Sequence, residues 1–137
     1  MLRRIHPALV LSLPLMLAGM SRIPAPSTPA RAPKLVVVKA ADVSATEFKW
    51  SPGDITANPG DTIRFEQTTA TPHNVEFRET PAGVDLGASK MGPFLVAPGD
   101  HYDLVIDGRF KAGVYKFVCT PHESMGMKGT ITVAGGK

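Results

Sequence analysis

The regular spacing of short apolar runs between turn residues is the feature that most limits the possible folds. From residue 35 to residue 133, these runs are separated by clusters of Pro, Gly and Asp such as "SPGD" and "ANPGD". No long stretch has the apolar period of roughly 3.6 residues that is typical of an amphipathic helix. The pattern predicts an all-β protein, built as a sandwich or a barrel.

The runs also predict individual strands. The expected strands are residues 34–40, a strand near Phe48, a short strand at Ile55, and residues 62–67, 73–77, 101–107, 113–119 and 129–133. The first run, "KLVVVKA", is continuously apolar, so we expect it to be buried on both faces. Residues 79–98 are irregular, and one long connection among short strands favours a Greek-key sandwich.

The two ends of the chain differ in composition. Residues 1–20, "MLRRIHPALVLSLPLMLAGM", combine two arginines with a short apolar run, which predicts a signal peptide or, if uncleaved, an N-terminal anchor. Residues 21–33 are Pro-rich and predict an extended linker. Residues 34–137 are then one folded domain of a size that suits a single sandwich.

The distribution of charge argues against nucleic acid as a partner. The whole chain has a net charge of +3, but four of its arginines lie in residues 1–33. From residue 34 onward, 11 Lys and Arg against 12 Asp and Glu leave a net charge of −1. The predicted domain therefore lacks the basic surface that nucleic-acid binding requires.

The chain has one cysteine, Cys119, so no disulfide can form within it. In an exported protein a single cysteine indicates an intermolecular bridge, a metal ligand, a reactive thiol or an inert buried side chain. Cys119 ends a predicted strand, on the same face as Tyr115 and Phe117. We therefore expect the thiol to face the core at one end of the sandwich.

The residues around the thiol favour the metal-ligand alternative. In "CTPHESMGM", His122 follows three residues after Cys119, and Met125 and Met127 follow within the same loop. Far upstream, His73 is predicted to face the core at one end of its strand. Two imidazoles, a thiolate and a thioether are ligands that favour copper or zinc over magnesium or calcium, and they are the set of an electron-transfer copper site.

The segments "TPHNVEF" and "GVYKFVCTPHESMGMKGTITV" resemble the plastocyanin-like cupredoxins, which are small type 1 blue copper proteins. The resemblance covers essentially all of the predicted domain and implies a cupredoxin fold, a Greek-key β-sandwich of about eight strands with one type 1 copper ion at one end. It also implies that residues 34–137 form a cupredoxin domain that reversibly carries one electron.

Carried over by position, the resemblance makes His73, Cys119 and His122 the equatorial copper ligands. Met127 matches the axial ligand of plastocyanin-type and pseudoazurin-type loops, whereas Met125 matches the shorter amicyanin-type loop. The residues around Met127 favour it as the axial ligand. The resemblance further implies that an asparagine, Asn74, supports the ligand loops by hydrogen bonding and that the electron passes to and from the site through His122.

These expectations define a carrier and not an enzyme, because residues 34–137 contain only three histidines, too few for a second copper site. The expected partners are redox proteins, either cytochromes or copper or haem oxidoreductases, that dock transiently on a monomer.

The alternative function is an exported copper-handling protein with the same ligands. The leader predicts the periplasm, with the thylakoid lumen or a membrane-anchored form outside the cytoplasmic membrane as alternatives. Val118 departs from plastocyanins, which usually have tyrosine before the cysteine.

Overall fold

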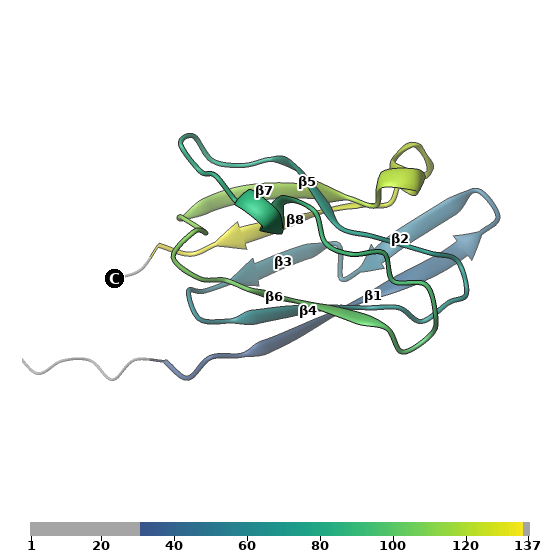
Figure 1. Ribbon diagram of the computed structural model, residues 1–137, viewed down its shortest axis with the longest axis horizontal. Coiled ribbons are helices and arrows are strands. Elements are labelled where there is room, and N and C mark those ends of the chain that lie inside the picture. The colour runs from purple at the N-terminus through teal and green to yellow at the C-terminus, as the bar shows by residue number, and fades with distance from the viewer. Residues whose placement is uncertain (1–30, 136–137) are drawn as a thin grey trace, which may run out of the picture. The chain divides into compact units, whose positions relative to one another are not determined.

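The computed structural model describes residues 31–135, so the predicted signal peptide and most of the predicted linker lie outside the described residues. Eight strands form two four-stranded sheets (Figure 1). The strands are β1 (Leu35–Ser44), β2 (Glu47–Ser51), β3 (Asp54–Ala57), β4 (Thr62–Glu66), β5 (Glu76–Glu79), β6 (His101–Val105), β7 (Gly113–Val118) and β8 (Lys128–Val133). Two 3-10 helices, η1 (Gly87–Lys90) and η2 (Thr120–Met125), lie in connections.

The order of strands is β2-β1-β4-β6 in one sheet and β3-β8-β7-β5 in the other. Strands β4 to β7 alternate between the sheets along the chain, which is the crossing pattern of a Greek-key sandwich. The predicted all-β sandwich is therefore confirmed. Among the described residues, no helix is long and apolar enough to cross a membrane.

Alternating side chains from both sheets fill the core between the layers. In β4, Ile63 and Phe65 are fully buried as predicted, while Arg64 and Glu66 lie toward the outer face. In β7, Tyr115 and Phe117 point inward, and Cys119 follows on the same face with no exposed surface. The core therefore continues directly to the thiol at the end of the sandwich.

Two details of the strand predictions are wrong. Leu35 and Val37 are exposed, because β1 alternates between the core and an outer face that no other layer of the described residues covers. Residues 73–77 were expected to be one alternating strand, but β5 begins only at Glu76 and all five residues are buried. The segment from His73 to Val75 runs between the layers, where an isolated bridge pairs His73 with Leu95.

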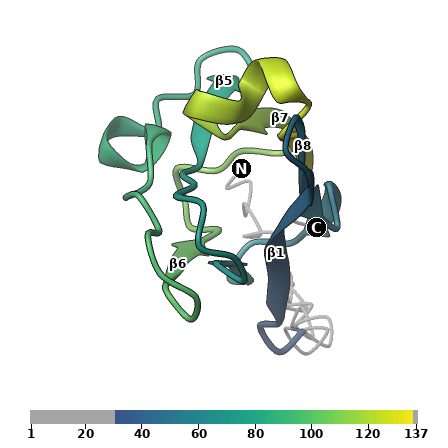
Figure 2. The same cartoon turned by 90° about the vertical axis from the view of Figure 1, so that its right-hand side faces the viewer.

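One end of the sandwich gathers the segments that matter for the site. The β1–β2 hairpin and η2 lie at the same end (Figures 1 and 2). Contact between them is direct, because the ring of Phe48 in β2 stacks on that of His122 in η2 with centroids 4.1 Å apart. The site described below lies at this end.

Asp61 ties the first strand to the turn before β4. Its buried carboxylate accepts hydrogen bonds from the backbone N–H groups of Lys34 at 2.8 Å and Asn58 at 2.9 Å. The guanidinium of Arg31 donates to both carboxylate oxygens at 2.6 and 2.5 Å. Burial alone would raise the pKa of Asp61, but these donors outweigh burial and lower the pKa to about 2.

We predict that Asp61→Asn lowers the free energy of unfolding by about 2 kcal/mol at pH 7. Because the pKa of the folded state is depressed, this stabilisation is complete above the usual carboxyl pKa of 3.8 and is lost as the pH falls toward 2. Denaturant unfolding at pH 7 and pH 3 should show the gap between variant and wild type shrinking with acid. Asp103→Asn, which breaks an exposed ion pair with Arg64, is the control and should cost roughly 0–1 kcal/mol.

Candidate metal centre

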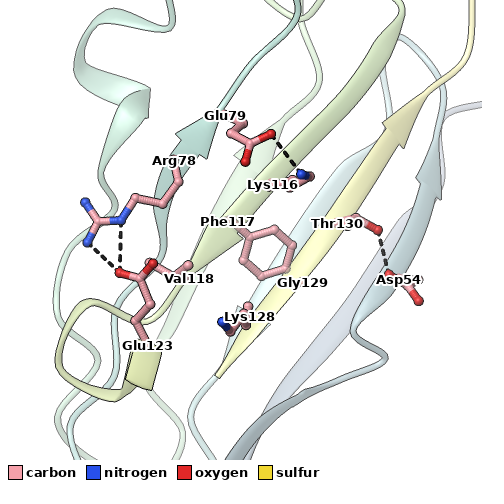
Figure 3. A pocket seen from close by; sticks show the side chains of 10 residues that line it. All are labelled: Asp54, Arg78, Glu79, Lys116, Phe117, Val118, Glu123, Lys128, Gly129 and Thr130. Carbon is pink, nitrogen blue, oxygen red and sulfur yellow. Dashed lines mark hydrogen bonds and ion pairs between the residues drawn. The ribbon is translucent and has the colours of Figure 1, made fainter. Parts of the chain in front are cut away.

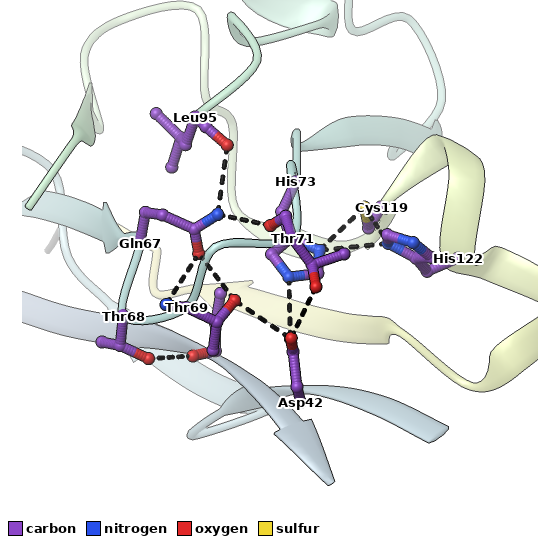
Figure 4. A network of polar contacts seen from close by, with 10 residues as sticks. Asp42, Gln67, Thr68, Thr69, Thr71, His73, Leu95, Cys119 and His122 are labelled. Carbon is purple, nitrogen blue, oxygen red and sulfur yellow. Dashed lines mark hydrogen bonds and ion pairs between the residues drawn. The ribbon is translucent and has the colours of Figure 1, made fainter. Parts of the chain in front are cut away.

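Three of the predicted site residues converge at the end of the sandwich. His73 precedes β5, Cys119 follows β7 directly, and His122 lies in η2. The Sγ atom of Cys119 lies 3.6 Å from Nδ1 of His73 and 3.4 Å from Nδ1 of His122. The two Nδ1 atoms are 3.1 Å apart (Figure 4).

The size of this triangle suits a metal ion. A point equidistant from three corners separated by 3.1, 3.4 and 3.6 Å lies about 2 Å from each. Metal–nitrogen bonds in proteins are roughly 2.0–2.1 Å long and metal–thiolate bonds roughly 2.3 Å. These are the only residues in the described part of the chain that form such a cluster of three His, Cys, Asp or Glu side chains. The donor set and the spacing therefore both fit a copper ion.

The loop from Cys119 to Met127 is closed by backbone hydrogen bonds. The N–H of His122 donates to the carbonyl of Cys119 at 3.0 Å, and the N–H of Met127 donates to the carbonyl of His122 at 3.1 Å. The N–H of Cys119 in turn donates to the carbonyl of Met127 at 2.9 Å. Gly126 adopts a left-handed conformation (φ 88°) that ends η2 and turns the chain back into β8.

The two methionines of this loop have different environments. Met127 has no exposed surface and belongs to the core cluster that also includes Cys119. Met125 is 38% exposed at the end of η2. Of the two methionines, only Met127 is therefore buried in the core cluster that contains the thiol.

Asn74 joins the two segments that supply the converging side chains, as the sequence resemblance implied. Its Oδ1 accepts a hydrogen bond from the N–H of Thr120 at 2.8 Å, and its Nδ2 donates to Thr120 Oγ1 at 3.0 Å. Thr120 Oγ1 donates onward to the buried Glu76 at 2.9 Å. This chain of bonds fixes the segment after His73 against the start of η2.

Burial dominates the electrostatics of the converging groups. It raises the pKa of the Cys119 thiol, although the backbone amides of Asn74 and His122 oppose the effect by hydrogen bonding to sulfur. Burial also lowers the pKa of His73, which favours the neutral imidazole that a metal requires. The site therefore presents a neutral imidazole beside a thiol that ionises readily only when a cation binds.

Sequence reasoning missed two residues that contact the imidazoles. Asp42 in β1 faces the far edge of His73, with Oδ1 3.1 Å from Nε2. Phe48 was expected only as a strand residue, yet its ring stacks on His122 and meets the edge of His73. No local pattern marks either contact, since both depend on how β1 and β2 lie against residues far away in the chain.

The comparisons with known proteins identify a copper-binding family. The family model described as copper binding proteins, plastocyanin/azurin family, matches residues 37–134. A plastocyanin from Ginkgo biloba is 39% identical over 94 residues, covering 66% of this chain and 92% of that protein. A plastocyanin from Prochlorothrix hollandica is 36% identical over 124 residues, covering 90% of this chain and 89% of that protein.

A solved structure supports the same assignment. A mutant fern plastocyanin superposes with a TM-score of 0.59 at 33% identity, covering 72% of this chain and all of that one. The chain belongs to the plastocyanin/azurin family of copper-binding proteins. Its fold is the cupredoxin sandwich expected from the sequence.

We predict that Asn74→Ala destabilises the metal-free protein by about 2 kcal/mol, because it removes both bonds to Thr120 and leaves a backbone donor without its partner. The variant should also expose Cys119 to a thiol reagent faster than the wild type, since the start of η2 is no longer held. Thermal unfolding and thiol labelling of the metal-free protein measure the two effects. Thr130→Ala, which removes an exposed hydrogen bond to Asp54, should change both by little.

Proposed function

We propose that this protein is a type 1 copper protein that carries one electron at a time between redox partners. The observation that carries the proposal is the convergence of two imidazole Nδ1 atoms and one thiol within 3.6 Å of one another at the end of the sandwich. Membership of the plastocyanin/azurin family supports it. Bound copper would supply a centre that accepts one electron as Cu(II) and releases it as Cu(I).

In this proposal His73, Cys119 and His122 hold the ion and Met127 is the weak fourth ligand. The thiolate and thioether suit Cu(I), while imidazole suits both oxidation states. Met127 is preferred over Met125 because it is enclosed with Cys119, whereas Met125 projects from the end of η2. The three backbone hydrogen bonds of the loop support a set of donors that moves little when the charge of the ion changes.

The rigidity of the site favours an electron carrier over a copper-handling protein. A protein that delivers metal needs ligands that open to a receiving partner, but His73 and Cys119 are fully buried and joined through Asn74 and Thr120. The exposed thioether of Met125 is the one feature that favours copper handling. The proposal is for a carrier and not for an enzyme, in line with the three histidines of residues 34–137.

The proposed route for the electron passes through His122. This imidazole is partly exposed, unlike that of His73, and lies in η2 beside exposed Pro121 and Met125. Pro72, next to His73, is exposed as well. A small apolar surface of this kind suits brief docking of a cytochrome or another copper or haem protein, acting in the periplasm or the thylakoid lumen.

The outer face of the β3-β8-β7-β5 sheet suits a docking partner less well. It carries a pocket of about 470 Å³ that includes Val118, the residue before the thiol (Figure 3). Its charges largely neutralise one another: Arg78 pairs with Glu123 at 2.9 Å, and Lys116 pairs with Glu79 at 2.9 Å. Val118 is itself 4% exposed, so it offers a partner little contact.

The central test is copper reconstitution of the purified protein. We expect Cu(II) to produce an intense visible thiolate-to-copper band that bleaches on addition of one electron per protein and returns on oxidation. Cys119→Ser should abolish the band, because the hydroxyl of serine does not supply the thiolate. A protein that stays colourless with Cu(II) and prefers zinc would contradict the proposal.

Separate replacement of the two methionines tests the fourth ligand. Met127→Leu should change the visible spectrum and the reduction potential while costing less than about 1.5 kcal/mol of stability, since the volume is conserved. Met125→Leu is the matched control and should leave both properties at their wild-type values. The opposite result would make Met125 the fourth ligand.

A further inference from the structure

The carboxylate of Asp42 is the centre of a hydrogen-bond network behind His73 (Figure 4). Thr71 Oγ1 donates to Oδ2 at 2.6 Å, and Thr69 Oγ1 donates to Oδ1 at 3.1 Å. Nε2 of His73 lies 3.1 Å from the same Oδ1. Asp42 is on β1, in the opposite sheet from β5 and β7, so the contact reaches the imidazole from across the sandwich.

The segment that carries these donors is held independently. The buried amide of Gln67 donates to the carbonyl of Thr71 at 2.5 Å and to that of Leu95 at 3.2 Å. Leu95 and His73 also exchange backbone hydrogen bonds at 3.0 and 2.7 Å. The backbone around Thr71 and His73 is therefore held by Gln67 and Leu95, while the threonine hydroxyls hold the carboxylate of Asp42.

The geometry assigns the two nitrogens of His73 different roles. A ring nitrogen that faces a carboxylate carries the proton, so Nε2–H donates to Asp42. Nδ1 then presents its lone pair to the point shared with Cys119 and His122. The carboxylate thus selects the tautomer and the ring orientation that a metal ligand needs.

We propose that Asp42 is a positioning residue that orients His73 and, through its negative charge, favours the oxidised state of the copper site. The proposal rests on the function proposed above. An ionised carboxylate behind an imidazole increases the electron density on the ligating nitrogen, which stabilises Cu(II) more than Cu(I). A neutral acceptor in the same place would supply the orientation without this bias.

The surroundings keep the carboxylate charged. Burial alone would raise the pKa of Asp42, but hydrogen bonds from Thr71, His73 and Thr69 outweigh burial and hold the pKa below its usual value. The side chain of Asp42 is 28% exposed, while that of His73 is fully enclosed. Water therefore screens the charge in part, and one hydrogen-bond contact joins the carboxylate to the enclosed ring.

Asp42→Asn separates charge from orientation, because the amide oxygen can still accept from Nε2–H. We expect this variant to keep the visible thiolate-to-copper band, while the ratio of Cu(II) to Cu(I) affinity falls about tenfold. Such a change raises a one-electron reduction potential by about 59 mV. Asp42→Ala, which removes charge and acceptor together, should raise the potential as well and also alter the band. If Asp42→Asn does not fold, the reduction potential of Asp42→Ala tests the proposal instead, and an unchanged potential would overturn it.

A measurement without metal tests the orientation alone. Nitrogen-15 shifts of the metal-free wild type should show His73 protonated at Nε2, and that proton should exchange faster with solvent in Asp42→Ala. Asp103→Asn removes a carboxylate of similar exposure from β6 and should leave the potential, the band and the His73 tautomer unchanged.

The outcomes distinguish the two proposals. A wild-type protein that forms no blue copper site would contradict the proposed function, and this inference with it. A blue wild-type protein whose Asp42→Asn and Asp42→Ala variants keep the wild-type potential would overturn the role of Asp42 alone. A His73 ring that is protonated at Nδ1 in the metal-free protein would also overturn the role of Asp42 alone.

Discussion

The structure of the site depends on the closure of the β7–β8 loop by the bond from the N–H of Cys119 to the carbonyl of Met127. This bond extends the pairing of Val118 with Lys128 by one step beyond the strands. It makes a thiol, an imidazole and a thioether parts of one short hairpin loop. Because β7 and β8 are the central strands of their sheet, each is paired on both sides, and this pairing anchors both ends of the loop.

The remaining imidazole has to come from elsewhere, and both sheets contribute to its placement. His73 lies in the segment that crosses from β4 in one sheet to β5 in the other, and its backbone pairs with Leu95. Asp42 contacts its ring from β1, and Asn74 binds the η2 loop at Thr120. Because β5 and β7 pair in the same sheet, their pairing and the bond from Thr120 to Asn74 set the spacing between His73 and Cys119, while the opposite sheet supplies the contact from Asp42.

The sequence predicted those parts of the site that depend on local pattern. Cys119 and His122 are three residues apart in one loop. His73 is buried as expected, although the alternating strand from which this was predicted does not form. No local pattern predicts the contact of Asp42 with His73 or that of Phe48 with His122, because each joins residues more than 30 positions apart in the chain. The same limitation explains the wrong expectation for β1: a continuous apolar run does not reveal whether a second layer covers its outer face.

The two imidazoles of the site differ in a way that suits electron transfer. His73 is enclosed and faces a carboxylate, so its environment is polar on the side away from the thiol. His122 is partly exposed and stacks on Phe48, which restrains the ring without adding charge. Asp42 therefore contacts the enclosed ring, while a partner can approach the exposed one. If Asp42 acts on His73 and partners dock at His122, the reduction potential is set on one side of the site and docking takes place on the other. A substitution could then change the docking surface without changing the potential, or the potential without changing the docking surface.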